Sequence, residues 1–351
     1  MISGLSTGLD LRARCEEALS RGVDFLEGAQ DASGLWSDFP TNRSGESTAW
    51  VTGFVLTHCR DISDSAKARA VIALYRERPD SCGWGFSKNT PPDADSTLHV
   101  ILGLVSSGED PASLATDFDF IRSHQLSDGG FATYKESQVL SDYRRHDSIR
   151  DYSGWLQSHN CVSAAVLLGA AIVPQLLNAA ALNALTAFIL DRQRPEGSWP
   201  AYWWRTMAFT TSHSIQALTL LPAQDGCQAA AAGLRWFNES RLQMGAWSNG
   251  YDHASCSLST ALAVQALALA GPDPPHFVSA VEYLLGEQLP DGSWRSSKVL
   301  RIPPPHIVDA DLFAQWREAG LGVGSISSGS RRVYVTAAVL RALRLATQRL
   351  A

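Results

Sequence analysis

The chain has 351 residues, of which 45% are hydrophobic and 18% charged, and its formal net charge is −6. This length and apolar content are enough for a globular protein with a sizeable core. The acidic balance and the lack of a Lys/Arg cluster argue against nucleic acid as a partner.

The N-terminal stretch and the cysteines predict a cytoplasmic, reduced protein. The first residues lack the basic and apolar regions of a secretory signal. The longest apolar run, residues 162–177, is too short for a comfortable bilayer span and contains Pro174, so we interpret it as a buried helix. The cysteines are widely spread without a Cys-x-x-Cys pair, which favours free thiols over a disulfide framework: Cys15, Cys59, Cys82, Cys161, Cys227 and Cys256.

An internal repeat follows the aromatic residues. A Gly-containing turn and an aromatic residue recur at Trp36, Trp84, Phe131, Trp199, Trp247 and Trp294, spaced 48, 47, 68, 48 and 47 residues apart. Four units also carry a glutamine six positions before the aromatic: Gln30, Gln125, Gln193 and Gln288. A repeat of about this length predicts stacked helical units rather than an irregular fold.

Each unit combines two kinds of helix. After the aromatic, a hydroxyl residue opens a helix of small apolar residues, as expected for an element buried on all sides: Thr48, Thr97, Ser163, Thr211, Thr260 and Thr336. The helices before the aromatics mix charged residues with apolar periodicity, as one buried face requires. We therefore predict an all-α, (α/α)6 toroid, a single domain over residues 1–351 with longer loops at about 136–157 and 297–332.

The predicted ring brings the starts of the inner helices together at one mouth of a central cavity, where helix dipoles make the field positive. The residues two positions before each hydroxyl should face one another there: Glu46, Asp95, Cys161, Phe209, Leu258 and Tyr334. Asp95 and Glu46 are the carboxylates among them. A simpler interpretation makes Asp93, Asp95 and Ser96 ordinary helix caps.

The segment Cys82–Leu104, "CGWGF" followed by "PPDADSTLHVILGL", resembles a known family. In squalene-hopene and oxidosqualene cyclases, Gly-Gly-Trp-x-Phe leads into Asp-x-Asp-Asp-Thr-Ala or Asp-Cys-Thr-Ala. The segments "ILDRQRPEGSWPAYWW" and "EYLLGEQLPDGSW" resemble the QW repeats of the same class II terpene cyclases. The likeness covers most of the chain and matches the catalytic barrel of those two-domain enzymes. Its repeats also occur in the wider toroid superfamily, which includes protein prenyltransferase β subunits.

The resemblance implies specific roles for five residues. Asp95 matches the proton-donating Asp, and Asp93 matches the first Asp of the motif. Ser96 replaces the Asp or Cys expected next, which departs from the family pattern. "SHNCVSAAV" resembles a Glu-Cys-Thr-Ser-Ala segment. By this resemblance Cys161 would orient or reprotonate Asp95, together with Ser96 and the neighbouring His159.

The implied reaction is a cyclisation or isomerisation of a prenyl or terpenoid chain that begins when a neutral carboxylic acid protonates an alkene or epoxide. It needs a dry site and π faces for the carbocation, and implies neither cofactor nor metal. Trp36, Trp247 and Trp294 are expected only to staple helices. The predicted substrate-contacting residues are Trp84, Phe86, Tyr134, Tyr202, Trp203, Trp204, Phe209, His213 and Tyr334.

Two other functions stay open on the sequence. Related toroids of the prenyltransferase and lanthionine-cyclase types use zinc, and residues suited to zinc lie near inner-helix starts: His159, Cys161, His213, Asp252, His253 and Cys256. Alternatively, the ring binds apolar ligands without catalysis. Because the second domain of triterpene cyclases is missing, we expect a shorter or more polar substrate than squalene, and at most transient contact with a membrane surface.

Overall fold

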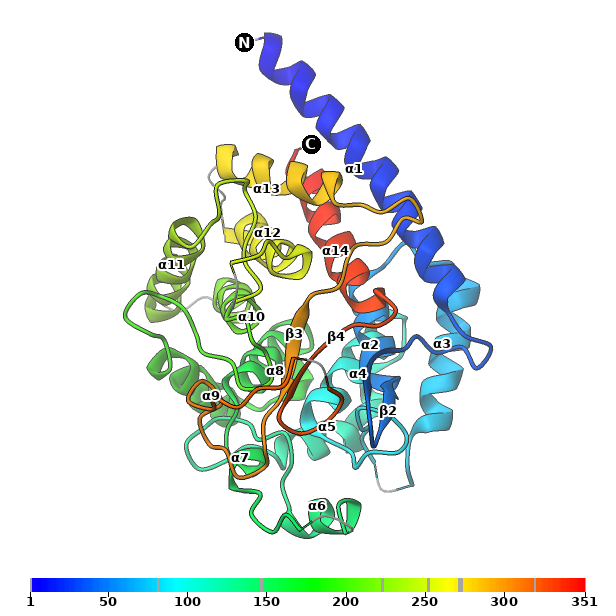
Figure 1. The fold of residues 1–351 in the computed structure, drawn as a ribbon, viewed down its shortest axis with the longest axis vertical. Helices are drawn as coiled ribbons and strands as arrows, with labels where there is room; N and C mark the ends of the chain where they lie inside the picture. Colours follow the sequence, from blue (N-terminus) through cyan, green and yellow to red (C-terminus); the bar gives the residue numbers. More distant parts are fainter. Residues whose placement is uncertain are drawn as a thin grey trace.

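A computed structural model describes residues 2–80, 82–145, 148–221, 224–250, 253–270, 274–318 and 320–350. Helices dominate, and they form two concentric sets (Figure 1). The inner set is α2 (Ala49–His58), α4 (Ala94–Ser106), α8 (Asn160–Ile172), α10 (Ala208–Leu220), α12 (Ser257–Ala270) and α14 (Val333–Arg349). The outer set is α1 (Ile2–Ala29), α3 (Asp64–Glu77), α5 (Ala115–Arg122), α9 (Ala179–Asp191), α11 (Gln224–Glu239) and α13 (Pro274–Gly286).

The inner helices close into a ring. Each packs against the next in chain order, and α14 contacts both α12 and α2, so the last helix completes the circle. Each outer helix packs against an inner neighbour, with α1 lying against α14. The predicted (α/α)6 toroid is confirmed.

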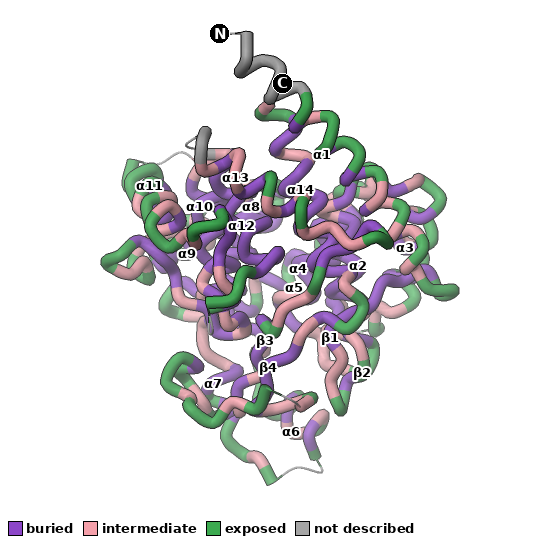
Figure 2. Tube along the Cα trace, turned by 45° about the horizontal axis from the view of Figure 1, so that its top comes forward, coloured by how far each residue is buried: buried purple, intermediate pink, exposed green. Residues whose placement is uncertain are grey.

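The inner helices are buried on nearly all sides, and the outer ones alternate buried and exposed faces (Figure 2). Small residues let the inner helices approach closely. A Cβ atom at Gly53 of α2 would lie 2.4 Å from the carbonyl oxygen of His99 in α4. Ring closure therefore depends on the small-residue composition of these helices.

The repeated aromatics staple each unit. The indole Nε1 atoms of Trp36, Trp84, Trp199, Trp247 and Trp294 each donate to the backbone carbonyl ten residues earlier. The four glutamines each donate to a carbonyl of the adjacent turn and to one in a neighbouring outer helix. The Gln288 amide reaches Ala18 O at 2.9 Å, which joins the end of the chain to α1.

The hydroxyl residues accept a hydrogen bond from the backbone N–H of the repeat aromatic. Thr97, Ser163, Thr211, Thr260 and Thr336 do so as the repeat predicts. In the first unit the acceptor is Thr52, one helical turn later than the predicted Thr48. The hairpin of β1 (Asp38–Thr41) and β2 (Gly45–Ser47) lengthens the connection there.

That shift of one turn corrects the prediction for Glu46. The residue two positions before Thr52 is Trp50, so an indole takes the place expected for a carboxylate. Glu46 instead forms an ion pair with Arg331, whose guanidinium lowers the pKa of Glu46.

The remaining elements lie in the two long loops and the shorter connections. They are η1 (Pro111–Leu114), α6 (Ser137–Tyr143), α7 (Ser153–Leu156), η2 (Pro174–Leu176), β3 (Lys298–Ile302) and β4 (Ser325–Ser328). β3 and β4 pair antiparallel and cross the middle of the ring in the view of Figure 1. The two hairpins were not predicted, because their strands are too short to show alternating hydrophobicity.

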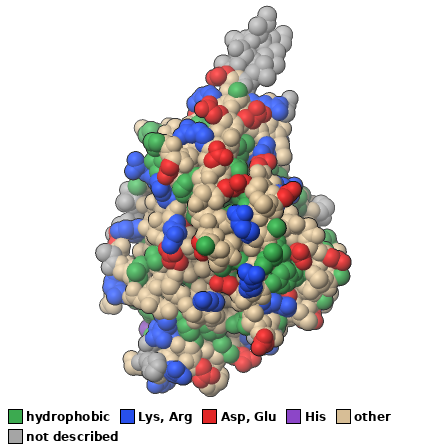
Figure 3. Space-filling view, turned by 90° about the vertical axis from the view of Figure 1, so that its right-hand side faces the viewer, with side chains coloured by type: hydrophobic (Ala, Val, Ile, Leu, Met, Phe, Trp, Pro, Cys, Tyr) green, Lys and Arg blue, Asp and Glu red, His purple; other side chains and the backbone are tan. Residues whose placement is uncertain are grey.

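The surface in Figure 3 mixes acidic and basic side chains without a continuous basic stripe over the face shown. No helix in the described ranges is long and apolar enough to span a bilayer.

Candidate active site

A cavity of about 380 Å³ lies at the mouth where the inner helices begin, and we call it the central cavity. Its aromatic lining residues are Trp50, Phe86, Tyr134, Tyr143, Trp155, Trp203 and Trp204. The two carboxyls of the cavity are Asp93 and Asp95, and its arginines are Arg43, Arg144, Arg301 and Arg317. The cavity thus has an aromatic wall, one pair of acids and several cationic side chains.

Asp93 is the N-cap of α4 and is 2% exposed. Its carboxylate accepts from the Ser96 N–H at 2.8 Å and from the Ser96 hydroxyl at 2.7 Å. Burial raises the pKa of Asp93 to about 7, and the hydrogen bonds from Ser96 oppose the shift. Ser96 therefore supports Asp93, whereas the sequence suggested that it would act on Asp95.

Asp95 lies in the first turn of α4, and its side chain keeps 18% exposure toward the cavity. Burial raises the pKa of Asp95 to about 8, and the nearby charge of Asp93 raises it further. The indole N–H of Trp50 opposes this by stabilising the ionised form. Burial thus raises the pKa of both carboxyls, and the charge of Asp93 adds to the rise at Asp95.

The two acids have different environments. Asp93 accepts two hydrogen bonds from Ser96 at the positive end of a helix dipole, which favours its carboxylate form. The charge of Asp93 then favours neutral Asp95. Two neighbouring carboxyls whose environments separate their pKa values are the pattern of an acid and its supporting base.

One aromatic cluster surrounds Asp95. Trp50 stacks on Tyr334 at 4.8 Å between ring centroids, and Tyr334 stacks on Phe54 at 3.8 Å. Trp204 stacks on Phe209 at 4.4 Å. Tyr334 and Phe209 therefore support the cavity-lining indoles from behind, and neither lines the cavity itself.

A second cluster holds Trp203. Its Nε1–H donates to the Thr133 hydroxyl at 2.8 Å, and that hydroxyl bonds His159 Nδ1 at 2.7 Å. His159 Nε2 bonds the Gly154 carbonyl at 2.8 Å. This set fixes His159 as the Nε2–H tautomer, and burial lowers its pKa to about 4, so the ring is neutral. His159 thus positions Trp203, and its bonds lead away from Asp95.

Cys161 and Tyr202 lie behind the cavity lining. Burial raises the pKa of the Cys161 thiol to about 11, and backbone N–H groups of Trp203 and Tyr202 oppose the shift. Tyr202 stacks on His159 at 4.0 Å and donates its hydroxyl to Ile307 O. The charge of Asp95 is near enough to raise the pKa of the Cys161 thiol further. Cys161 and Asp95, both described in the structure, are not hydrogen-bonded to each other.

Two further predicted residues lie away from the central cavity. The indole of Trp84 is fully enclosed and donates to Leu74 O at 2.7 Å, so it is a staple like Trp36. Its place directly before the acid segment had suggested a contact with substrate. His213 lines a separate, smaller cavity farther along the ring axis. Of the predicted residues, the central cavity is lined by Phe86, Asp93, Asp95, Ser96, Tyr134, Trp203 and Trp204.

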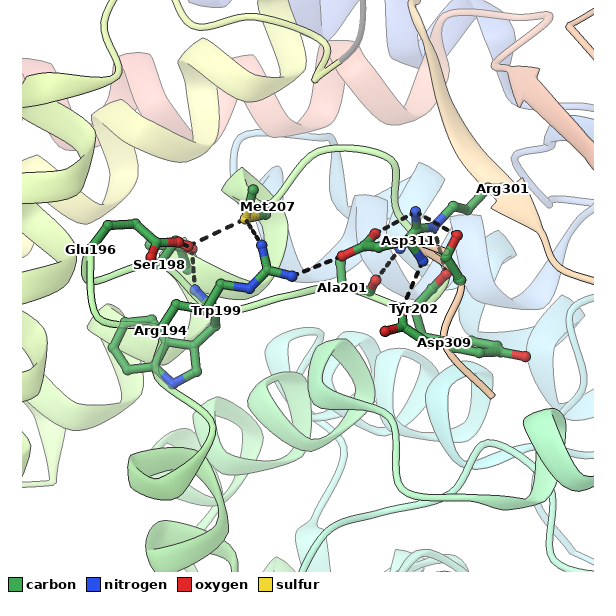
Figure 4. Close-up of polar contacts among 12 residues, drawn as sticks. Arg194, Glu196, Ser198, Trp199, Ala201, Tyr202, Met207, Arg301, Asp309 and Asp311 are labelled. Atoms are coloured by element: carbon green, nitrogen blue, oxygen red, sulfur yellow. Dashed lines mark hydrogen bonds and ion pairs between the residues drawn. The ribbon is translucent and has the colours of Figure 1, made fainter. Parts of the chain in front are cut away.

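The loop at 297–332 closes over the mouth. The Trp155 indole N–H donates to Pro303 O at 3.0 Å. Leu300 and Trp204 pair through an antiparallel backbone β-bridge. Arg301 is buried; it donates to the carbonyls of Ala201 and Tyr202 and pairs with Asp311 at 2.8 Å (Figure 4). Arg194 binds the other Asp311 oxygen at 2.9 Å. These contacts hold the loop in place beside the cavity.

The described ranges contain no site for the zinc that the alternative function would need. No group of three or more His, Cys, Asp or Glu side chains lies there in a geometry that could hold a metal ion. Asp252 is outside the described residues. His159, Cys161 and His213 are engaged separately, as given above.

Sequence reasoning missed several cavity residues. Trp50 was hidden by the register of the first unit, where a spacing of twelve residues from Trp36 favoured Thr48 over Thr52. Arg301 and Arg317 come from a loop without a repeat pattern. Thr133, between Trp203 and His159, has no signal of its own in the sequence.

A family model described as the squalene-hopene cyclase C-terminal domain matches residues 73–300. The chain belongs to this family. The squalene–hopene cyclase of Bradyrhizobium diazoefficiens is 25% identical over 259 residues, which cover 66% of this chain and 38% of that protein. A drimenyl diphosphate synthase of Streptomyces showdoensis is 25% identical over 250 residues, 68% of this chain and 43% of that protein. The chain spans less than half the length of these curated relatives.

Solved structures of the same fold match nearly the whole chain. A protein from Actinoplanes is 31% identical with a TM-score of 0.84, and the match covers 95% of this chain and 99% of that one. The type II terpene cyclase MstE from Scytonema, solved with geranylgeranyl dihydroxybenzoate as substrate, is 24% identical with a TM-score of 0.85, covering 97% and 99%. The ring formed by this chain therefore matches nearly the full length of both solved structures.

Proposed function

We propose that this protein is a protonation-initiated, class II-type cyclase of a prenyl chain, with Asp95 as the Brønsted acid. The observation that carries the proposal is that the carboxyl of Asp95 faces an aromatic cavity, where burial raises its pKa. Protonation of an alkene or epoxide by Asp95 generates a carbocation. The faces of Trp50, Trp203 and Trp204 stabilise that cation without supplying a base that would end the reaction early.

The supporting groups suit this chemistry. Asp93 keeps the proton on Asp95 until the substrate arrives, because its charge disfavours a second carboxylate nearby. The loop at 297–332 limits the access of water, which would quench the cation. The carboxyl is positioned by α4, a rigid element, as a proton donor requires.

We further propose that the substrate carries a polar, anionic head group. Arg43, Arg144, Arg301 and Arg317 line the cavity, and guanidinium groups bind carboxylate and phosphate oxygens through charge-assisted bonds. Arg301 is already paired with Asp311, and the cationic lining as a whole favours an anionic group over a pure hydrocarbon such as squalene. The known ligand of MstE, a prenylated dihydroxybenzoate, and the diphosphate named for the Streptomyces relative are both chains of the proposed kind.

The test is to incubate wild type and Asp95→Asn with prenyl diphosphates, prenylated aryl carboxylates, prenyl alcohols and squalene, with and without an epoxide. Mass spectrometry and NMR then identify the products. We expect wild type to convert an anionic prenyl substrate into a cyclic isomer of equal mass. Asp95→Asn should lose at least about a thousandfold in rate, because the proton donor is gone.

Binding separates catalysis from ligand capture. Quenching of tryptophan fluorescence should give similar affinities for wild type and Asp95→Asn, since the amide keeps the size of the carboxyl. Cyclisation by Asp95→Asn at the wild-type rate would overturn the role of Asp95. Tight binding without any product in wild type would instead identify a non-catalytic binder.

A further inference from the structure

A second, small cavity lies farther along the ring axis, and we call it the rear cavity. Its polar lining residues come from different inner helices: His58 of α2, His99 of α4, His213 and Gln216 of α10, Gln265 of α12 and Arg341 of α14. The volume is about 10 Å³, roughly the space that a single water needs. Its rim includes partly exposed side chains of Thr57 and Arg341 and exposed Ile172, so it reaches toward solvent.

His99 stands between the two cavities. One helical turn after Asp95, it shares the same face of α4, and its Nε2 atom lies 3.8 Å from Asp95 Oδ1. The side chain is 3% exposed and also lines the rear cavity. Neither ring nitrogen has a hydrogen-bond partner among the described residues. A buried imidazole with two unused nitrogens between an acid and a polar cavity has the placement of a proton relay.

The surroundings keep His99 neutral. Burial lowers its pKa to about 3, and the nearby His213 contributes in the same direction. Arg341 adds a positive charge to the rear cavity and is held by Gln216 at 2.9 Å, while Gln265 donates to Ala338 O at 2.9 Å. A neutral imidazole can donate from one nitrogen and accept at the other, which an imidazolium cannot.

We propose that His99, together with water in the rear cavity, returns the proton that Asp95 gives up in each turnover. This inference rests on the proposed cyclase function. After the substrate is protonated, Asp95 is a carboxylate. The His99 Nε2–H bond breaks as a proton moves to Asp95 Oδ1, and Nδ1 takes a proton from rear-cavity water, which solvent replenishes. One proton moves from solvent to Asp95, and rotation of the ring restores the starting tautomer.

Delivering the proton to Asp95 from the rear cavity has a physical advantage over delivering it through the central cavity. Water admitted beside the aromatic wall would compete with the substrate and trap the cation. The rear cavity delivers a proton while the hydrocarbon chain keeps the other side dry. The Trp50 ring, edge-on to His99 at 6.0 Å, and the Phe54 ring at 5.6 Å flank this path with apolar surface.

The test compares first and later turnovers of His99→Phe by rapid quench, with a prenyl substrate that wild type cyclises. Phenylalanine keeps an aromatic ring but cannot carry a proton. We expect the first turnover, made with preloaded Asp95, to stay within about threefold of wild type, and later turnovers to slow at least about tenfold. His99→Ala should slow likewise and recover when imidazole is added. His124→Gln, which removes a buried histidine of an outer connection, is the matched control and should leave both phases unchanged.

A second measurement needs no substrate. A pH jump from above to below the pKa of Asp95 should produce a protonated-carboxyl infrared band that Asp95→Asn lacks, and His99→Phe should slow its appearance. Equal slowing of first and later turnovers, or no slowing of either the turnovers or the band, would overturn the relay. If wild type forms no product while the band still appears slowly in His99→Phe, the cyclase proposal fails and the relay stands.

Discussion

Asp95 and Asp93 show how two identical side chains two residues apart acquire different chemistry. Asp93 is bonded twice by Ser96, whereas Asp95 faces the cavity beside the Trp50 ring. Burial raises the pKa of both, but the Ser96 bonds favour the carboxylate of Asp93, whereas the charge of Asp93 favours the neutral form of Asp95. In the proposed function, local environment at the scale of single hydrogen bonds therefore makes Asp95, and not Asp93, the proton donor.

The pH dependence of catalysis should follow Asp95. Because burial raises its pKa to about 8, the acid form dominates below that pH and is lost as the pH rises through it. We expect kcat to be level through neutral pH and to fall about tenfold per unit above about pH 8. Steady-state rates across that range check this. A fall centred near the ordinary carboxyl value of 3.8 would contradict it.

The free energy of unfolding should also fall as pH rises, but in a lower pH window than kcat. The folded state holds the Asp95 proton more tightly than the unfolded chain, so the free energy of unfolding decreases as pH rises from about 4 to about 8. Asp95→Asn removes this dependence. We expect the variant to gain stability over wild type by up to about 1.4 kcal/mol per pH unit across that window, measured by urea denaturation. Parallel curves for both proteins would refute the assignment.

At the scale of elements, each turn before a repeat aromatic brings the chain close to an outer helix. Gly129, at φ +88°, would place a Cβ atom 2.5 Å from Ala184 O. In the second unit Cys82 occupies the equivalent position with φ +109°, a conformation that side chains rarely adopt. Arg78, bound to Asp117 at 2.9 Å, replaces the usual glutamine of this unit. The cysteine in this turn therefore sets the second unit apart from the others, next to the helix that carries the acids.

Cys82→Gly should relieve backbone strain. We expect an increase of about 1 kcal/mol in the free energy of unfolding, since positive φ costs a side-chain residue about that much. Gly129→Ala is the matched opposite change and should destabilise, because its new Cβ atom meets a backbone carbonyl. Differential scanning calorimetry compares the three proteins. Destabilisation by Cys82→Gly would mean that packing of the thiol outweighs the strain.

At the scale of the whole molecule, the ring closes through contacts between its first and last units. α14 packs between α12 and α2, and α1 lies against α14. The Gln288 amide bonds Ala18 O and Gly292 O. The same glutamine motif that links neighbours elsewhere thus also joins segments 270 residues apart. Because the rear cavity is lined by residues of all six inner helices, its shape depends on that closure.

Gln288→Ala should weaken the contact between the last unit and α1. Loss of two partly buried hydrogen bonds should lower the free energy of unfolding by about 1–3 kcal/mol and speed amide exchange in α1. Gln30→Ala removes the equivalent pair between α1 and α3 and is the control, with faster exchange expected in α3. Hydrogen exchange with mass spectrometry distinguishes the two patterns. If Gln288→Ala speeds amide exchange evenly over the whole ring, the idea that Gln288 stabilises mainly its contact with α1 is contradicted.

The sequence determined the repeat and therefore the ring. Spaced aromatics, glutamines and hydroxyls make backbone hydrogen bonds that recur in most units, so a one-dimensional pattern could reveal them. It also placed Asp93 and Asp95 at the start of a buried helix, because caps and apolar runs are local signals.

Only the tertiary structure decided what surrounds those acids. Trp50 enters the cavity because a hairpin shifts the first unit by one turn, and Arg301 and Arg317 arrive from a loop about 200 residues away in the chain. His99 looked like any residue of an apolar helix until α2, α10, α12 and α14 enclosed a polar cavity beside it. Such groups meet only when the ring closes, since their contacts join units that no local spacing connects.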